Sequence, residues 1–392
     1  MSEWVSKKIG DIANLYQGLA INAKTKHLLV TESSLPLLRI KDLLEGTKEQ
    51  FVDPKLAPLQ CVVEPNELVM TRTGQVGYVF MGKSGVLHNN CFKITVTDPE
   101  VDTRFLYWHF NSNAQRDYLT TIAAGSVQPD LNHKVFKDYD VLLPPLTEQK
   151  AIASVLSSLD DKIDLLHRQN KTLEAMAETL FRQWFIEEAK EDWEEKTIGD
   201  IFTIKGGGTP STKEPSYWDG GIAWTSPRDL STAKSLYMFS TERTITELGL
   251  TKVSSGLLPV GTLLMSSRAP IGYLALTDIE VAVNQGYIAI LKHDLYSNEF
   301  MYLWCKANME LIKNSGNGSV FQEISKASFR ELPFVCPPEP LLKEFNDRCI
   351  NWFSKIKLNT KQIQTLENLR DTLLPKLMSG EVRVQYQTEE VA

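Results

Sequence analysis

Residues 4–12 read W-V-S-K-K-I-G-D-I and residues 193–201 read W-E-E-K-T-I-G-D-I, so the tryptophan and the final I-G-D-I recur at one spacing. Further identical residues follow 195 positions apart: Met70 and Met265, Gly77 and Gly272, Tyr78 and Tyr273, and Asn89 and Asn284. The separation falls to 193 at Pro144 and Pro337, as loop insertions and deletions would produce. A repeat of this length is far longer than a solenoid repeat, so the sequence predicts two copies of a whole domain.

The composition excludes several classes of protein. With 392 residues, of which 42% are hydrophobic, the chain can form two or three domains with cores of their own. No stretch approaches the roughly 20 apolar residues that span a bilayer, so we expect a cytoplasmic protein without a membrane partner. The five cysteines form no C-x-x-C pair, which favours reduced, buried thiols over a disulfide framework or a zinc site.

The formal net charge of −7 argues against a simple nucleic-acid-binding protein, because neutralising phosphates requires clustered lysine and arginine. The basic residues are spread along the chain, and no segment forms a basic patch by itself. If the protein binds DNA, its charge must be segregated by face, or partner subunits must supply much of the contact with phosphates.

Each copy begins with a strand-rich region and ends with a long helix. Short apolar runs punctuated by glycine, proline and asparagine predict two domains of mixed α/β (α+β) class at residues 1–143 and 191–337. Residues 144–190 and 338–380 are predicted to be long helices, and residues 381–392 a tail.

A coiled-coil seam runs along both helices, because apolar residues alternate in steps of four and three for over four heptads. The seam contains Leu156, Leu159, Ile163, Leu166, Leu173 and Leu180 in the first helix, and Trp352, Ile356, Ile363, Leu366 and Leu373 in the second. A seam of about 40 residues, roughly 60 Å long, is not expected to stay unpaired in water. Each helix is therefore expected to pair with its own copy.

The two helices could pair in either orientation. Parallel pairing would place both strand-rich domains at one end, whereas antiparallel pairing would invert them around a pseudo-two-fold axis, and we favour the antiparallel coiled coil. Asn170, Asn359 and Arg370 interrupt the apolar seam. A polar residue at such a position can fix the register at some cost in stability, or it can be tolerated near solvent; the sequence leaves both interpretations open.

Signatures of catalysis are absent from the sequence. There is no G-x-x-x-x-G-K-[ST] loop, no H-E-x-x-H and no G-x-S-x-G. The cluster Gly206–Gly208 lacks the spacing of a dinucleotide-binding loop, which favours a flexible turn over a phosphate-binding loop. The six histidines show neither metal-ligand nor triad spacing, so no catalytic residue and no metal site is predicted.

Several distinctive segments accompany the order domain, helix, domain, helix. Residues 206–230 read G-G-G-T-P-S-T-K-E-P-S-Y-W-D-G-G-I-A-W-T-S-P-R-D-L, residues 267–272 read S-R-A-P-I-G, and residues 284–286 read N-Q-G. Residues 143–149 read L-P-P-L-T-E-Q and residues 373–380 read L-L-P-K-L-M-S-G. Together with the paired I-G-D-I openings, these segments resemble the specificity subunit of Type I restriction–modification enzymes over essentially the whole chain.

The resemblance implies a non-catalytic DNA-specificity subunit. Its two target recognition domains, residues 1–143 and 191–337, would each read one half of a bipartite, asymmetric DNA site, and the helices would set the spacer between the halves. Two unlike domains on a pseudo-symmetric frame would read unlike half-sites, much as a symmetric dimer reads a palindrome.

The resemblance also implies partners other than DNA. Two methyltransferase subunits would dock on the helices and each flip an adenine out of the duplex, and two motor–nuclease subunits would join them for cleavage. S-adenosylmethionine, ATP and magnesium would be bound by those partner subunits and not by this chain.

The first copy departs from the family pattern. Residues 73–77 read T-G-Q-V-G where the second copy has R-A-P-I-G, and Asn89 and Asn90 stand where it has Asn284 and Gln285. Residues 18–30 lack the glycine-threonine-proline motif altogether. The roles of individual residues therefore transfer less directly to the first domain.

Side-chain chemistry indicates which residues could contact bases: arginine and lysine suit guanine, asparagine and glutamine suit adenine, and serine or threonine suit either. In the first domain they are Lys24, Lys26, Arg72, Thr73, Gln75, Asn89, Asn90, Gln128 and Asn132. In the second domain they are Thr209, Ser211, Lys213, Arg228, Ser267, Arg268, Asn284, Gln285 and Gln322. Because Asn89 and Asn284 recur in both domains, holding a shared turn is the alternative role for that pair.

Two other classes of function remain open. An enzyme with an unrecognised site, such as a free-standing nuclease, would need an acidic metal cluster, and Asp and Glu form no such motif. A duplicated coiled-coil scaffold that binds only proteins would have the same helices. Exchanging the variable loops separates this scaffold from a DNA reader, because only a reader would change its sequence preference.

Overall fold

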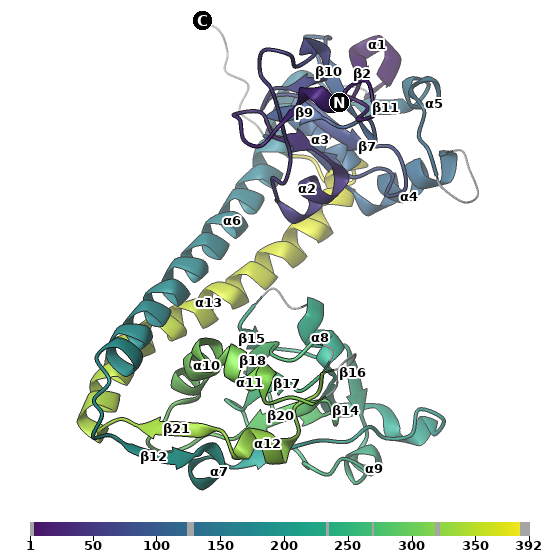
Figure 1. Cartoon of the computed structure of the whole chain (residues 1–392). Coiled ribbons are helices and arrows are strands. Elements are labelled where there is room, and N and C mark those ends of the chain that lie inside the picture. Colours follow the sequence, from purple (N-terminus) through teal and green to yellow (C-terminus); the bar gives the residue numbers. More distant parts are fainter. Residues whose placement is uncertain (1–3, 124–128, 233–234, 269, 318–321, 385–392) are drawn as a thin grey trace, which may run out of the picture. The chain divides into compact units, whose positions relative to one another are not determined.

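The computed structural model of the chain describes residues 4–123, 129–232, 235–268, 270–317 and 322–384 (Figure 1). The chain forms two compact units. The first unit comprises residues 1–162 and 366–392, and the second unit comprises residues 163–365. Each unit combines one strand-rich region with a part of both long helices, and this mixed architecture confirms the predicted fold class.

The strand-rich region of the first unit is built from short elements. Its strands are β1 (Val5–Lys8), β2 (Ala13–Gln17), β3 (Leu29–Val30), β4 (Leu37–Leu38), β5 (Phe51–Val52), β6 (Val62–Val63), β7 (Leu68–Thr71), β8 (Val79–Phe80), β9 (Gly85–Leu87), β10 (Cys91–Val96) and β11 (Asp140–Leu143). Its helices are α1 (Ile9–Ile12), α2 (Ile40–Glu45), α3 (Thr103–Phe110), α4 (Asn113–Ile122) and α5 (His133–Lys137).

The main sheet of the first unit has the antiparallel order β2-β10-β7-β8. A smaller sheet has the order β4-β9-β6, β3 pairs with β5, and β1 pairs with β11. Strand β7 is buried throughout because both of its faces are covered. Leu68 and Met70 face the core that contains Phe105, whereas Val69 faces a separate core with Leu87. Alternate residues of one strand thus serve two cores.

The second unit repeats this plan with insertions. Its strands are β12 (Glu194–Thr197), β13 (Ile204–Lys205), β14 (Trp218–Thr225), β15 (Tyr237–Met238), β16 (Arg243–Ile245), β17 (Leu263–Ser266), β18 (Leu274–Thr277), β19 (Ala282–Val283), β20 (Tyr287–Ile290) and β21 (Pro333–Cys336). Its helices are α7 (Ile198–Ile201), α8 (Pro227–Thr232), α9 (Glu247–Leu250), α10 (Asn298–Ala307), α11 (Met309–Asn314) and α12 (Lys326–Arg330).

The main sheet of the second unit has the order β13-β20-β17-β18-β15, and a second sheet has the order β16-β14-β19. Helix α10 packs on β17 and β18 (Figure 1). The recurring I-G-D-I segments form the equivalent helices α1 and α7. In α1 a Cβ built on Gly10 would lie 3.1 Å from the side chain of Lys137, and in α7 one on Gly199 would lie 2.9 Å from that of Arg330. The recurring glycine therefore lets α5 and α12 pack closely.

The two long helices are α6 (Leu146–Arg182), followed by a π-helical turn at Gln183–Glu187, and α13 (Glu339–Met378). Every predicted seam residue is buried or half-buried. Leu165, Met176, Leu358 and Leu369 lie outside the seam and are exposed, whereas Phe181, Phe353 and Leu374 extend the buried face beyond it. The seam pattern therefore identified the packed faces of both helices.

Within the second unit the helices run antiparallel. Phe181 of α6 lies beside Phe345 of α13, with ring centroids 6.1 Å apart, and Asn170 of α6 contacts Asn359 of α13. Residue numbers thus rise along one helix as they fall along the other. Asn359 is completely buried, so the interpretation that it is tolerated near solvent is wrong.

Within the first unit the direction is the same. Nη1 of Arg370 in α13 donates to Oδ1 of Asp160 in α6 at 2.6 Å. Leu374, one turn after Arg370, shares the core with Leu156, one turn before Asp160. Arg370, the third polar interruption of the seam, is therefore part of an ion pair between the helices.

Among the described helices, none is both long enough and apolar enough to cross a membrane.

Candidate nucleic-acid interface

Three loops of the second unit meet at one end of its main sheet: they follow β13, join β17 to β18, and join β19 to β20. Oγ1 of Thr209 donates to Oε1 of Gln285 at 2.6 Å and accepts from Nδ2 of Asn284 at 2.5 Å. Oδ1 of Asn284 accepts from the backbone N of Gly286 at 2.7 Å, so this side chain also holds its own turn. Three predicted DNA-binding residues are thus joined by their own hydrogen bonds.

Arg268 and Ser267 adjoin this group. A Cβ built on Gly286 would lie 3.2 Å from Nε of Arg268, and the backbone N of Ser267 donates to the carbonyl of Gly286 at 2.8 Å. Arg268 also forms an antiparallel backbone bridge with Glu323, whose neighbour Gln322 is exposed. The structure therefore brings Ser267, Arg268 and Gln322 to the same end of the sheet.

Ser211, Lys213 and Arg228 are exposed and lie outside this contact network. Oγ of Ser211 accepts from the backbone N of Lys213 at 3.4 Å, and its carbonyl accepts from Nε1 of Trp218 at 3.0 Å. Arg228 lies on α8, where its carbonyl accepts from Oγ of Ser231 at 2.7 Å. Among the described residues, no side-chain hydrogen bond joins these three residues to the group of Thr209, Asn284 and Gln285.

The glycine cluster is required by close packing. A Cβ built on Gly207 would lie 1.7 Å from the carbonyl oxygen of Val283, a distance that no side chain can occupy. The first unit repeats the contact, since a Cβ on Gly18 would lie 2.2 Å from the carbonyl oxygen of His88. Close packing against Val283 therefore requires glycine at position 207, a reason beyond the predicted flexibility, and Gly18 is its counterpart in the first unit.

In the first unit the guanidinium of Arg72 is held by neighbouring side chains. Its Nε and Nη2 donate to the two carboxylate oxygens of Asp130 at 2.9 and 2.6 Å, and Nη1 donates to Oε1 of Gln17 at 2.5 Å. Oγ1 of Thr73 donates to Asp130 at 3.1 Å. The hydrogen bonds from Arg72 hold the pKa of Asp130 below its ordinary value. Arg72 and Thr73 thus form a bonded cluster that would have to rearrange before contacting a base.

The other candidates of the first unit are spread over several loops. Lys24, Lys26 and Gln75 are exposed, and Asn89 and Asn90 are half-buried between β9 and β10. The carbonyl of Asn90 accepts from the backbone N of Arg72 at 2.9 Å, which brings this pair next to the Arg72 cluster. Oδ1 of Asn132 caps α5 by accepting from the N of Val135 at 2.9 Å. Gln128 lies outside the described residues.

The two units share one backbone frame at these loops. In each unit, three consecutive residues form an antiparallel backbone bridge, donate a backbone hydrogen bond and cap a short helix, in that order. The bridges join Thr73 to Asp130 and Arg268 to Glu323, the hydrogen bonds run from Leu131 to Arg72 and from Ile324 to Ser267, and the caps are Asn132 and Ser325. Asn132 therefore has a structural role that its counterpart Ser325 shares.

Sequence reasoning missed Gln17, Asp130, Glu323 and Lys326. A Cβ built on Gly206 would lie 2.3 Å from Nζ of Lys326, so this lysine lies directly over the loop that carries Thr209. Asp130 and Glu323 are 193 residues apart, and that repeat was the signal that could have identified them.

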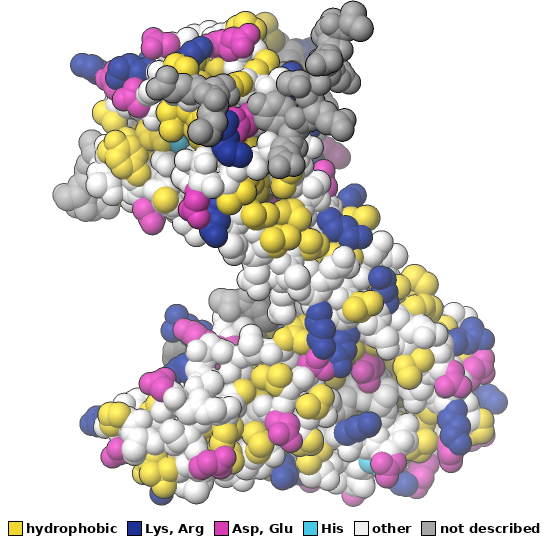
Figure 2. Space-filling model, turned by 180° about the vertical axis from the view of Figure 1, so that it is seen from behind, with side chains coloured by type: hydrophobic (Ala, Val, Ile, Leu, Met, Phe, Trp, Pro, Cys, Tyr) yellow, Lys and Arg dark blue, Asp and Glu magenta, His cyan; other side chains and the backbone are white. Residues whose placement is uncertain are grey.

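Charge is mixed on the face drawn in Figure 2. On the face drawn in Figure 2, coloured lysine and arginine side chains are interspersed with aspartate and glutamate and form no continuous basic surface. Within the described part of the chain, no three His, Cys, Asp or Glu side chains are placed to hold a metal ion.

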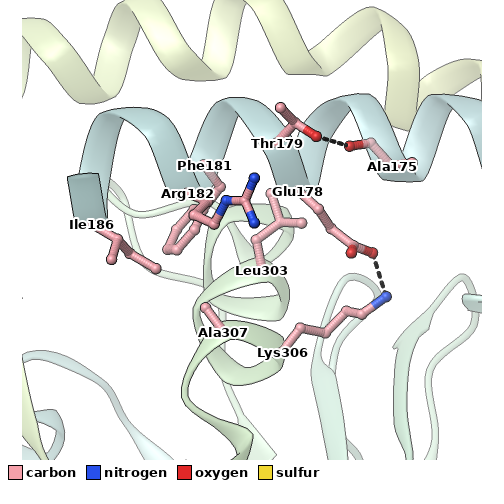
Figure 3. Close-up of a pocket in the computed structure, with 9 residues that line it drawn as sticks. All are labelled: Ala175, Glu178, Thr179, Phe181, Arg182, Ile186, Leu303, Lys306 and Ala307. Carbon is pink, nitrogen blue, oxygen red and sulfur yellow. Dashed lines mark hydrogen bonds and ion pairs between the residues drawn. The ribbon is translucent and has the colours of Figure 1, made fainter. Parts of the chain in front are cut away.

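A pocket of about 360 Å³ lies in the second unit between the end of α6 and α10 (Figure 3). Buried Phe181 and Leu303 line it, and Glu178 forms an ion pair with Lys306. Ile186, which also lines it, is 51% exposed. The pocket therefore has an apolar lining and a charged rim.

The first unit has a pocket of about 570 Å³ at the equivalent place, between the end of α13 and helices α3 and α4. Asp371, Leu374 and Trp108 line it at the positions that correspond through the repeat to Glu178, Phe181 and Leu303. The two units thus carry one groove twice, with an acidic residue and two apolar residues at matching positions.

The duplication also appears when the sequence is compared with known proteins. The family model described as "Type I restriction modification DNA specificity domain" matches residues 1–175 and again residues 190–368. The Type I restriction enzyme MjaIX specificity subunit of Methanocaldococcus jannaschii is 26% identical over 415 residues, covering 98% of this chain and 94% of that protein. The HindI specificity subunit of Haemophilus influenzae is 20% identical, covering 97% of this chain and all of that protein (100%).

A solved structure has a similar fold. The crystal structure of the Type I restriction-modification S subunit from M. genitalium superposes with a TM-score of 0.64 at 18% sequence identity, covering 98% of this chain and 97% of that one. Since the family model matches both copies of the repeat and most of the chain, this protein belongs to the family of Type I restriction modification DNA specificity domains.

Proposed function

We propose that this chain is the DNA-sequence specificity subunit of a Type I restriction–modification complex. Each unit reads one half of a bipartite, asymmetric DNA site, and the chain itself carries no catalytic centre. The observation that carries this proposal is the double match to the DNA specificity domain, one match on each copy of the repeat.

The shared frame and the unlike loops support a bipartite target. The two units hold their loops with the same backbone bridge and the same capped helix. The side chains on those loops differ, because Arg72 is bonded to Asp130 in the first unit whereas the second unit presents Thr209, Asn284 and Gln285 together. Equivalent frames with different side chains suit two different half-sites.

Partner subunits complete the activity in this proposal. Two methyltransferase subunits dock on this chain and two motor–nuclease subunits join them, and these partners bind S-adenosylmethionine, ATP and magnesium. The recurring groove supports a partner present in two copies, since two equivalent surfaces fit two copies of one protein. Mixed surface charge also favours a complex in which partners contribute to phosphate binding.

The long helices set the spacer between the two half-sites in this proposal. Inserting four residues into each helix adds about 6 Å of rise and should widen the spacer by one or two base pairs, each about 3.4 Å long. An unchanged spacer in the methylated motif would contradict this role of the helices.

The central experiment is methylation-aware long-read sequencing of DNA from cells that express the cognate methyltransferase subunit, with and without this chain. A bipartite motif that is methylated on both strands only when the chain is present supports the proposal. Methylation that does not depend on the chain would favour a protein-binding scaffold. Exchange of the loop at residues 206–214 for that of a relative should then alter one half-site only.

A further inference from the structure

Glu323 and Asp130 occupy equivalent positions but have different surroundings. Asp130 accepts hydrogen bonds from Arg72 and Thr73 within its own unit. Among the described residues, Glu323 makes no ion pair and its carboxylate accepts no hydrogen bond. The acidic side chain is therefore satisfied in the first unit and left exposed in the second.

The backbone of Glu323 is nevertheless held on two sides. It forms antiparallel bridges with Arg268 and with Asn317, and it exchanges both backbone hydrogen bonds with Asn317 at 2.9 and 3.0 Å. Residues directly opposite in such a bridge have Cβ atoms about 5 Å apart, on the same face. Arg268 and Glu323 are thus presented side by side from a fixed backbone.

Arg268 is likewise without an ion pair or side-chain hydrogen bond in the described part of the chain, although an acidic residue stands opposite it. It lies over Gly286, next to the bonded group of Thr209, Asn284 and Gln285. One cation and one anion are therefore available at the end of the sheet where the predicted DNA-binding residues gather.

An exposed carboxylate on a DNA-reading surface repels phosphates unless it accepts a hydrogen bond from a base. In the major groove, guanine presents the acceptors O6 and N7 to arginine, and cytosine presents its N4 amino group, which Glu accepts. These groups are neighbours in one G·C pair. The chemistry of Arg268 and Glu323 together matches both bases of such a pair.

We infer that Arg268 and Glu323 read one G·C base pair in the half-site of the second unit, Arg268 contacting the guanine and Glu323 the cytosine. This inference rests on the proposed function of the chain and adds Glu323 as a specificity-determining residue. The first unit lacks the equivalent pair, because Thr73 stands where Arg268 does and Asp130 is bonded to Arg72. The two half-sites should therefore differ at this position.

The test compares the methylated motifs produced by the complete complex with the wild-type chain, Glu323→Gln and Arg268→Lys. The wild-type motif should contain a G·C pair in one half-site. Glu323→Gln should lower discrimination at that position on the order of tenfold, because the amide can accept from cytosine N4 or donate to an acceptor such as thymine O4, whereas the carboxylate only accepts. Arg268→Lys should relax the same position, since lysine lacks the planar fork.

Glu331→Gln is the matched control, because it removes the same charge from an exposed residue eight positions along the chain. It should leave the motif unchanged, and thermal unfolding should confirm that all three variants fold. A wild-type motif that persists unchanged in both Glu323→Gln and Arg268→Lys would overturn the inference while leaving the proposed function intact. Absence of any motif with the wild-type chain would overturn the proposed function and this inference with it.

Discussion

Nδ2 of Asn359 donates to Oδ1 of Asn170 at 2.9 Å across the helix pair of the second unit, inside an otherwise apolar seam. Asn359 is completely buried, and within the described residues its own Oδ1 has no hydrogen-bond partner. A buried polar pair fixes the register of two helices at some cost in stability. The pair therefore selects one alignment of the helices.

Replacing both residues, Asn170→Leu with Asn359→Leu, should raise the free energy of unfolding by about 1–2 kcal/mol, because both buried polar groups are removed together. Thermal unfolding of the double variant measures this change. The single variant Asn359→Leu serves as the control and should gain less, since it leaves Oδ1 of Asn170 without the donor from Asn359. A double variant that melts below the wild type would show that the pair stabilises the fold.

We expect Arg383 to hold the C-terminal segment against the start of α6. Its guanidinium bonds both oxygens of Glu148, a completely buried carboxylate at the start of α6. Arg383→Ala would leave that charge buried without its cation and should cost about 3 kcal/mol. Chemical denaturation measures the loss, and Arg383→Ala combined with Glu148→Gln should recover part of it. Equal stability of wild type and Arg383→Ala would contradict this role.

Asp278 should make the second unit sensitive to acid. Burial alone would raise its pKa, but hydrogen bonds from Lys357 and Lys361 of α13 outweigh burial and hold the pKa below its ordinary value. A lowered folded-state pKa stabilises the protein above the unfolded-state pKa of about 4, and this stabilisation is lost as the pH falls through the folded-state value.

Asp278→Asn should therefore cost on the order of 2 kcal/mol at pH 7, and its stability deficit should shrink below about pH 4. Urea unfolding of wild type and variant from pH 7 to pH 3 provides the comparison. A deficit that stays constant over this range would show that the ion pairs do not contribute.

The repeated groove should bind the partner subunit. Ile186→Asp places a charge beside the apolar lining of the groove in the second unit and should weaken binding of the methyltransferase subunit by tenfold or more, about 1.4 kcal/mol. Leu165→Asp is the control, because Leu165 is an exposed apolar residue of the same helix that does not line the groove. Calorimetric titration measures the affinity of each variant for the methyltransferase subunit. If both variants bind equally weakly, the groove is not the docking surface.

The helices and the duplication were predictable because their signals are local and repeated. The seam residues are spaced by the period of the helix itself, so burial of Leu156, Ile163 and Ile356 follows from the sequence alone. The recurring I-G-D-I segments likewise form the equivalent helices α1 and α7. Patterns of this kind depend on neighbours a few residues away.

The candidate site was less predictable because its contacts join residues that are distant in the sequence. Arg72 has the chemistry of a guanine reader, yet its partner Asp130 lies 58 residues further along. Gly207 is predicted to lie in a flexible turn, and the structure adds that the approach of Val283 leaves no room for a side chain there. No pattern among neighbouring residues predicts the contact of Arg72 with Asp130 or that of Gly207 with Val283.

The sequence by itself determined the two-domain plan, the paired helices and the family, because a long duplication and a helical period survive changes at individual positions. Only the tertiary structure decided which polar side chains are engaged and which are left exposed. Asp130 and Glu323 are equivalent acidic residues in the repeat, but only Asp130 has a guanidinium folded against it. Whether a side chain is available to a ligand depends on the partners that the fold places within hydrogen-bond distance of it.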